Sequence, residues 1–128
     1  MILIDTSAWI DFFRDRAPAA DRVDAALASN DAAWCGPIET ELRRGFVNAR
    51  ERDQTLPLLA GCHFLPQPPD LWLEAGELGF ALRRRGITPK TFDLLIAVYA
   101  LSNAASLLST DSNFKAMIKA GIPLQLVS

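Results

Sequence analysis

Short apolar runs alternate with stretches of helical periodicity, and this alternation constrains the fold more than any other feature of the sequence. Strand-compatible runs occur at residues 1–4, 32–36 and 106–109, with helical patterns between them. Such alternation predicts an α/β fold in which helices cover both faces of a parallel sheet. Ligands of these folds bind beyond the carboxyl ends of the strands, so residues directly after a strand are candidates for function.

The other expected elements follow from periodicity, capping residues and helix stops. We expect helices at residues 8–14, 19–28, 37–47, 49–59, 71–85, 91–104 and 111–120. The proline-rich connection 61–70 is compatible with a short strand at 62–65, and 123–127 is expected as a final strand. A chain of 128 residues without repeats or low-complexity tracts is expected to form a single domain over 1–128.

Composition excludes several classes of protein. The chain is 50% hydrophobic and 22% charged, which excludes a disordered chain. Its longest strongly apolar run, 94–101, is too short for a membrane-spanning helix, which needs roughly 20 residues. No basic start or secretory pattern precedes Asp5, and Cys35 and Cys62 match neither a metal motif nor a disulfide framework. We therefore expect a cytosolic protein with reduced cysteines and no contact with membranes.

The net charge of −2 and a pI near 5.3 are not typical of proteins that bind nucleic acid through bulk charge. An enzyme that reaches phosphate through metal ions can nevertheless be acidic, provided basic residues line the approach to its site. The residues available for that role are Arg43, Arg44, Arg83, Arg84, Arg85, Lys90, Lys115 and Lys119.

Four acidic residues are candidates for a site, although each also has a structural interpretation. Asp5 and Asp111 directly follow expected strands, where an Asp can also cap a helix. Asp93 is the only charged residue between 91 and 110, and it either favours the helix N-terminus or faces the crevice. Glu41 could pair with Arg44, much as Glu39 is spaced to pair with Arg43 four residues on.

The conjunction of the four acids favours a cation site over four separate caps or ion pairs. All four map near one end of the expected sheet. Two carboxylates ~5 Å apart repel by about 3 kcal/mol at an effective dielectric near 20, so such a cluster recruits a cation or raises some pKa values. Oxygen ligands without Cys or His select Mg²⁺ or Mn²⁺ over zinc, and the single histidine, His63, is interpreted as structural.

Four stretches resemble, in order and spacing, the motifs of PIN-domain proteins, in particular VapC ribonuclease toxins. They are IDTSAWIDFFR (4–14), ELRRG (41–45), DLLIAVYA (93–100) and LLSTDSNF (107–114). The resemblance covers essentially the whole chain. It implies a three-layer α/β/α sandwich around a mainly parallel sheet, and a metal-dependent endoribonuclease that uses Mg²⁺ or Mn²⁺.

The resemblance also implies roles for individual residues. The metal-binding and catalytic acids would be Asp5, Glu41, Asp93 and Asp111. Thr6 or Ser7 would contribute a hydroxyl near them, and Asn113 stands where many relatives carry a further Asp. The loss of that charge bears on whether a second metal ion binds without substrate. The candidates for contacts with RNA or phosphate are Arg43, Arg44, Lys90 and Lys115.

Relatives of this type are usually homodimeric toxins of type II toxin–antitoxin pairs, held in check by a VapB antitoxin. The antitoxin's C-terminal segment lies across the crevice and often presents a basic side chain to the acids. Exposed apolar residues could supply such an interface, but core packing is the preferred expectation for the large aromatic residues Trp9, Phe13, Trp34 and Trp72.

The main alternative is a noncatalytic PIN-like module that binds protein or RNA, in which the acids serve only as caps. A haloacid-dehalogenase-like phosphatase is disfavoured because Ser7 stands where its second Asp is needed. A receiver domain is disfavoured because Lys90 does not end a plausible strand. The sequence does not identify the RNA target, since the rim of the site decides it and not the metal ligands.

Overall fold

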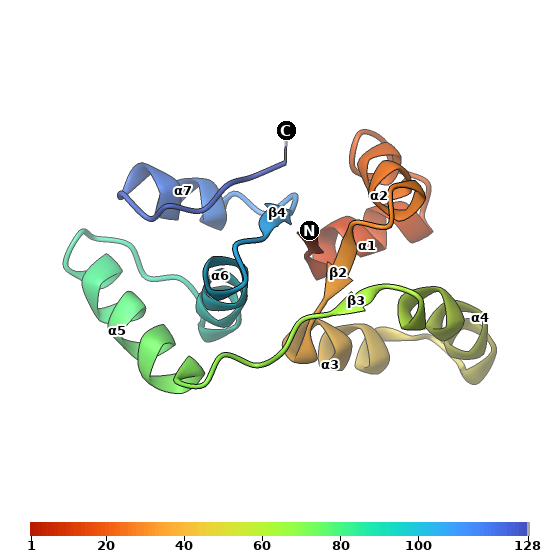
Figure 1. Cartoon of the computed structure of the whole chain (residues 1–128), viewed down its shortest axis with the longest axis horizontal. Coiled ribbons are helices and arrows are strands. Elements are labelled where there is room, and N and C mark those ends of the chain that lie inside the picture. Colours follow the sequence, from red (N-terminus) through yellow and green to blue (C-terminus); the bar gives the residue numbers. More distant parts are fainter. Residues whose placement is uncertain (128) are drawn as a thin grey trace.

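A computed structural model describes residues 1–127, and its four short strands form one parallel sheet (Figure 1). The strands are β1 (Ile2–Ile4), β2 (Ala32–Trp34), β3 (His63–Phe64) and β4 (Ser106–Leu108). Their order across the sheet is β3-β2-β1-β4, and β1 pairs in parallel with β2 and β4 on its two sides. The carboxyl ends of β1 and β4 therefore lie side by side.

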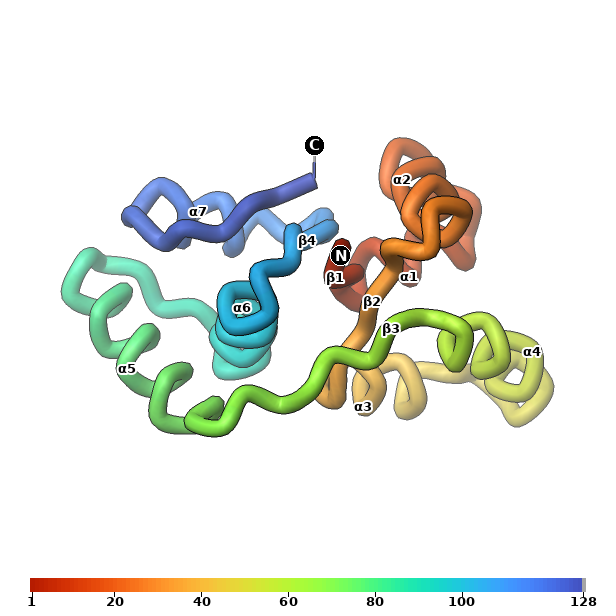
Figure 2. Tube along the Cα trace, in the orientation of Figure 1, coloured from red at the N-terminus to blue at the C-terminus, as the bar shows by residue number. Residues whose placement is uncertain are grey.

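Seven helices surround this sheet within residues 1–127. They are α1 (Thr6–Phe13), α2 (Ala19–Ala28), α3 (Gly36–Gly45), α4 (Ala49–Ala60), α5 (Leu71–Arg83), α6 (Thr91–Ser102) and α7 (Asn113–Lys119). α1 packs against α2 on one side of the strands, and α5 packs against α6 on the other (Figures 1 and 2). This arrangement confirms the predicted three-layer α/β/α fold.

The core explains why strands of two or three residues suffice. β2 is buried at every position, and Leu3, Ile4, Leu107 and Leu108 are at most 1% exposed. Strands covered by helices on both faces need no polar alternation, as the sequence shows. α6 is buried continuously from Asp93 to Ala100, which accounts for its unbroken apolar sequence. Each large apolar side chain buried in this way stabilises the fold by about 1.5–3 kcal/mol.

Local signals set several helix ends. Pro37 occupies the first turn of α3, where its missing N–H costs nothing. Asn48 caps α4 by accepting a hydrogen bond from the Glu51 backbone N–H at 2.9 Å. Gly86 follows α5 with φ of +81°, a left-handed conformation that favours glycine.

The expected final strand at 123–127 is wrong as a full strand, because only Leu126 forms a bridge, to Leu107. The Leu124 N–H bonds to the Ile122 carbonyl at 2.9 Å in a tight turn, which leaves too few extended residues to pair further. The short strand anticipated at 62–65 is present as β3. α7 begins at Asn113 and not at 111, so Asp111 lies in the loop before it.

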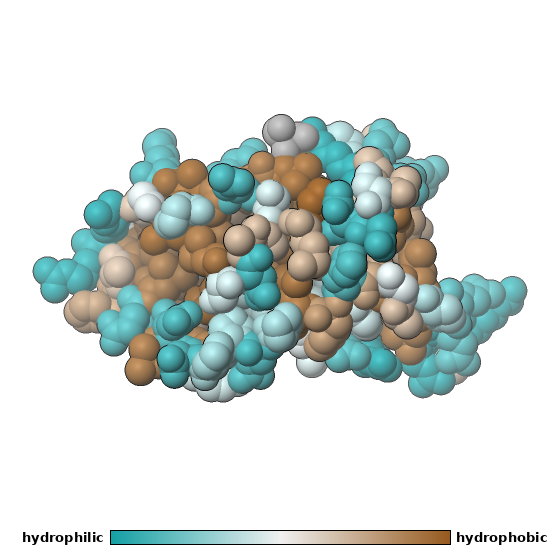
Figure 3. Space-filling model, in the orientation of Figure 1, coloured by the Kyte–Doolittle hydropathy of each residue, from teal (hydrophilic) through white to brown (hydrophobic). Residues whose placement is uncertain are grey.

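The aromatic residues expected in the core divide into two groups. Trp9 and Trp34 are buried, as predicted. Phe13 and Trp72 are 38% and 68% exposed, so the prediction is wrong for these two. Trp72 lies on α5 with Leu73 and Phe80, which are also exposed. Apolar surface extends over the region of α5, α6 and α7, whereas the outer end of α4 is hydrophilic (Figure 3).

Two further expectations concern cysteines and membranes. Cys35 is buried and Cys62 half-buried, and both are free thiols, as predicted. Burial raises the pKa of the Cys35 thiol to about 12, which keeps it protonated and unreactive. Within residues 1–127 no helix has the length and apolar character that a membrane crossing requires.

Candidate active site

The site begins where β1 and β4 end together. Ile4 is in register with Leu108, and the Asp5 backbone N–H bonds to the Leu108 carbonyl at 2.9 Å. This parallel pairing brings Asp5 beside Ser109, two residues that are 104 positions apart in the chain. α3, which carries Glu41, starts after the neighbouring strand β2 and contacts both α1 and α6. These contacts place Glu41 near the same edge of the sheet.

Asp5 is the buried centre of this edge, with a side chain only 5% exposed. Its Oδ2 accepts hydrogen bonds from Ser109 Oγ at 2.7 Å and Ser7 Oγ at 3.1 Å. Among the described residues its side chain caps no backbone N–H of α1, so capping does not explain it. Its Oδ1 is buried and has no hydrogen-bond partner within residues 1–127. A buried acceptor without a partner costs free energy unless a donor or a cation reaches it.

The two serines form a hydroxyl network between the ends of β1 and β4. Their Oγ atoms lie 3.2 Å apart, and Thr110 N–H donates to Ser7 Oγ at 3.1 Å. Asp111 N–H donates to Ser109 Oγ at 3.0 Å. Ser109 thus holds both Asp5 and the loop that carries Asp111, a role that sequence reasoning missed. Its only signal in the sequence was its place at the end of the strand-compatible run 106–109.

Asp93 is the second buried acid, 6% exposed in the first turn of α6. Burial raises its pKa, and repulsion from Asp111 and Glu41 acts in the same direction. A hydrogen bond from Asn113 Nδ2 to Asp93 Oδ2 at 3.0 Å and the charge of Lys90 oppose that rise. Asn113 is therefore a donor to the site, a contact that an ionised Asp at this position could not make.

Asp111 and Glu41 are half-buried and differ in their surroundings. Asp111 Oδ1 accepts from the Asn113 backbone N–H at 2.9 Å, so this acid does help α7 to begin. Glu41 forms no ion pair with Arg44 among residues 1–127, whereas Glu39 pairs with Arg43 at 3.0 Å as predicted. Glu41 is thus left to face the hollow that Thr6 also lines.

The four acids influence one another electrostatically, with Asp93 at the centre. Burial is the main cause of the raised pKa of Asp5, and the charge of Asp93 adds to it. The charges of Asp111 and Glu41 in turn raise the pKa of Asp93. No three Asp, Glu, His or Cys side chains within residues 1–127 are arranged closely enough to hold a metal ion as they stand. The acids therefore lie near one edge of the sheet but do not form a complete coordination shell for a metal ion.

The donor set nevertheless suits a hard divalent cation. Its members offer only carboxylate and hydroxyl oxygens, the ligands that Mg²⁺ and Mn²⁺ prefer. The unpartnered Oδ1 of Asp5 fits a bound cation, and so does the Thr6 hydroxyl, which is also buried without a partner among the described residues.

The four basic candidates have unequal relations to this site. The charge of Lys90 acts on Asp93, and Arg44 lines an open hollow together with Glu41. Arg43 is engaged with Glu39 on the surface of α3. Lys115 is exposed on α7, and no hydrogen bond or ion pair within residues 1–127 links it to the acids.

Comparison with known proteins identifies relatives over most of the chain. Residues 2–120 match the family model of the PIN domain. Ribonuclease VapC11 of Mycobacterium tuberculosis is 32% identical over 119 residues, which cover 89% of each chain. Ribonuclease VapC32 of the same organism is 40% identical over 67 residues, 52% of this chain and 49% of that one.

Solved structures share the fold. VapBC2 of Rickettsia felis, bound to a promoter DNA fragment, superposes with a TM-score of 0.77 at 20% identity, covering 99% of this chain and 98% of that one. VapBC-1 of nontypeable Haemophilus influenzae gives a TM-score of 0.76 at 23% identity, covering 100% and 98%. The family-model match over residues 2–120 and the 32% identity to Ribonuclease VapC11 show that the chain belongs to the PIN domain family, within its VapC group.

Proposed function

We propose that the chain is a magnesium-dependent endoribonuclease, the toxin of a type II VapBC pair, which hydrolyses phosphodiester bonds of RNA. The observation that carries this proposal is Asp5, a buried carboxylate with an unpartnered oxygen at the carboxyl edge of a parallel sheet. The charge of Asp93 acts on Asp5, and those of Glu41 and Asp111 act in turn on Asp93. Relatives that are 32% identical to the chain are named ribonucleases, which supports RNA as the substrate.

In this proposal Asp5, Glu41, Asp93 and Asp111 hold Mg²⁺ or Mn²⁺. A metal ion held by these residues would supply Lewis-acid chemistry toward water and the phosphate. Neutralising these acids also removes the electrostatic cost of burying Asp5 and Asp93. An acid cluster that is unfavourable in the metal-free protein is therefore favourable with the ion bound.

The chain's own groups position the acids and attract the substrate. Ser109 and Ser7 fix the carboxylate of Asp5, and Asn113 fixes that of Asp93. Arg44 and Lys90 add positive charge beside the acids, where a phosphate would approach. Thr6 offers a hydroxyl at the same edge. Hydrolysis of this kind needs no covalent intermediate on the protein.

We further propose a VapB-like antitoxin as partner, because the structural relatives are VapBC complexes. A basic side chain of such a partner could take the place of the cation among the acids. A homodimer is also proposed, for which exposed Trp72, Leu73 and Phe80 on α5 offer apolar surface. The cytosolic location stays a prediction.

An RNA cleavage assay with and without Mg²⁺ tests the activity. Asp5→Asn and Asp93→Asn are expected to lower the rate at least about 100-fold, because each removes charge from a metal ligand. Asp24→Asn, a change at an exposed position of α2, should keep wild-type activity. Equal activity in all four proteins would contradict the assignment. RNA binding without cleavage in any of them would favour the noncatalytic module.

Toxicity is tested by expressing the chain without a partner. Growth arrest is expected, and Asp93→Ala should relieve it. Arrest that persists with the variant at equal protein level would contradict the proposed role of Asp93.

A further inference from the structure

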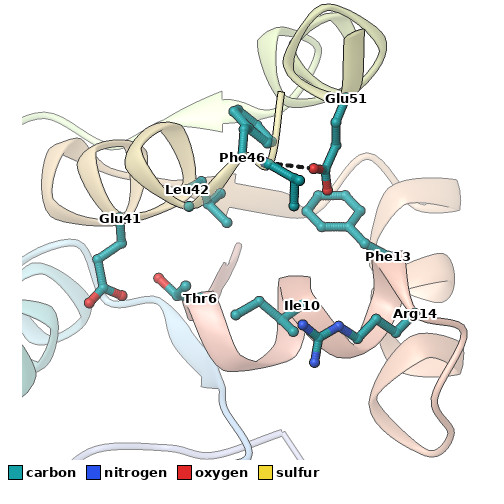
Figure 4. A pocket seen from close by; sticks show the side chains of 10 residues that line it. Thr6, Ile10, Phe13, Arg14, Glu41, Leu42, Phe46 and Glu51 are labelled. Atoms are coloured by element: carbon teal, nitrogen blue, oxygen red, sulfur yellow. Dashed lines mark hydrogen bonds between the residues drawn. The ribbon is translucent and has the colours of Figure 1, made fainter. Parts of the chain in front are cut away.

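A cavity of about 190 Å³ lies between α1 and α3, and its lining includes Thr6 and Glu41 of the candidate active site (Figure 4). Thr6 and Glu41 lie at its end nearest the acids. Arg14 and Glu51 lie at the opposite end. The cavity is therefore continuous with the candidate active site, and a molecule held by the acids could extend into it.

The walls of the cavity are apolar and partly aromatic. Ile10 and Phe13 come from α1, and Leu42 and Phe46 come from α3 and its C-terminal end. Ile10 and Phe13 are 37% and 38% exposed, so the chain itself leaves this apolar surface open. Flat, apolar faces bounded by aromatic side chains suit the stacking of an unpaired nucleobase.

The far end of the cavity carries one cation and one carboxylate. Arg14 is exposed at the end of α1 and forms no ion pair within residues 1–127. Glu51 Oε2 accepts a hydrogen bond from the Val47 backbone N–H at 2.8 Å, which fixes the orientation of the carboxylate. Oε1 can then accept from a ligand. The guanidinium group of Arg14 is therefore a donor, and the oriented carboxylate of Glu51 an acceptor, at the same small apolar cavity.

We propose that this cavity is the base-recognition subsite of the enzyme and that it takes guanine next to the cleaved phosphate. The proposal rests on the proposed function, because the acids must hold that phosphate. The volume is below the ~300–1,000 Å³ of sites for drug-sized ligands, so it suits a base and not a whole nucleotide. Guanine alone presents two acceptors, O6 and N7, to an arginine and two donors, N1–H and N2–H, to a carboxylate.

Binding of mononucleotides tests the subsite independently of cleavage. Nuclear magnetic resonance titrations with Mg²⁺ would compare the 5′-monophosphates of guanosine, adenosine, cytidine and uridine. We expect guanosine monophosphate to bind at least about tenfold more tightly than the other three. Arg14→Met and Glu51→Gln should each remove most of this preference, and a Gln at position 51 can still accept from Val47 N–H.

Matched controls separate base recognition from general charge. Arg16→Met and Glu77→Gln make the same changes at exposed positions that do not line the cavity, and both should keep the preference. Equal binding of the four nucleotides to the wild type overturns the proposal, and so does a preference that Arg14→Met leaves intact.

A cleavage arm distinguishes failure of the subsite from failure of the activity. Sequencing the ends produced from a random RNA pool should show guanine enriched at one position beside the cut, and the enrichment should fall about tenfold in Arg14→Met. Cleavage without any guanine enrichment refutes the proposed subsite but does not contradict the proposed ribonuclease activity. Absence of cleavage together with selective guanosine monophosphate binding refutes the activity and supports the subsite as a nucleotide site.

Discussion

Replacing Ser109 by alanine tests whether this hydroxyl holds the site together. The substitution removes the 2.7 Å hydrogen bond to Asp5 Oδ2 and the acceptor for the Asp111 backbone N–H. Ser7 still donates to the same Oδ2 at 3.1 Å, so the carboxylate does not lose every partner. The change is small in volume, which limits any effect from packing.

The expected magnitude follows from the charge on the acceptor. A hydrogen bond to a charged group contributes about 1.5–3 kcal/mol, and the remaining Ser7 contact offsets part of its loss. We expect Ser109→Ala to lower the free energy of unfolding by about 2 kcal/mol. The part that belongs to the Ser109–Asp5 contact is expected to be about 1.5 kcal/mol.

A double-mutant cycle with Asp5→Ala isolates that part, because the loss of the Asp111 contact occurs in both backgrounds and cancels. Urea unfolding in metal-free buffer gives the four free energies. Ser29→Ala serves as control, because the Ser29 hydroxyl bonds the Ala25 carbonyl at an exposed position. The effect of this substitution should be additive with that of Asp5→Ala. A Ser109–Asp5 coupling below about 0.5 kcal/mol would refute the positioning role.

Three further predictions concern stability and reactivity. Mg²⁺ at ~100 times its Kd should raise the free energy of unfolding by about 2.7 kcal/mol and Tm by about 10 °C in a thermal melt. Asp5→Asn should lose most of this rise in Tm, and an unchanged Tm of the wild type would contradict metal binding. Gly76→Ala, at an exposed and open position of α5, should raise the free energy of unfolding by about 0.5–1 kcal/mol, whereas Gly86→Ala should lower it by about 1 kcal/mol because φ is +81° there. Urea unfolding in which both substitutions change the free energy in the same direction would contradict this. In a thiol titration of the native protein Cys62 should react and Cys35 should not, since Cys35 is buried and its pKa is raised to about 12; two equally fast thiols would contradict this burial.

Much of the fold was predictable because the signals were local. Short apolar runs at 1–4 and 106–109 indicated buried strands, and the alternation of strands with helices indicated that the strands are parallel. The lone acid Asp93 in an apolar helix indicated a position with a special partner, and the structure buries it at the edge of the sheet. These inferences needed only periodicity and the cost of burying charge.

What escaped prediction depends on contacts between distant segments. The bond from Ser109 to Asp5 exists because Ile4 and Leu108 are in register, and register is not visible in either segment alone. The contact of Asn113 was likewise not visible in the sequence, where this residue only indicated one negative charge fewer than in many relatives. In the structure its side chain donates a hydrogen bond to Asp93.

The exposed side chain of Trp72 shows a different limit. A large aromatic residue at helical spacing is expected in the core, but α5 turns this position outward. Composition and periodicity cannot distinguish a core residue from one that a partner covers.

The central claim is that Asp5, Glu41, Asp93 and Asp111 meet around a divalent cation. Anomalous diffraction from crystals soaked in Mn²⁺ tests it most directly, because Mn²⁺ accepts the same oxygen ligands as Mg²⁺ and its position is observed without assumption. The account predicts Mn²⁺ bound to the carboxylates of Asp5 and Asp93, and its loss in Asp5→Asn. Mn²⁺ found only at acids elsewhere on the surface, or the same peak retained in Asp5→Asn, would contradict it.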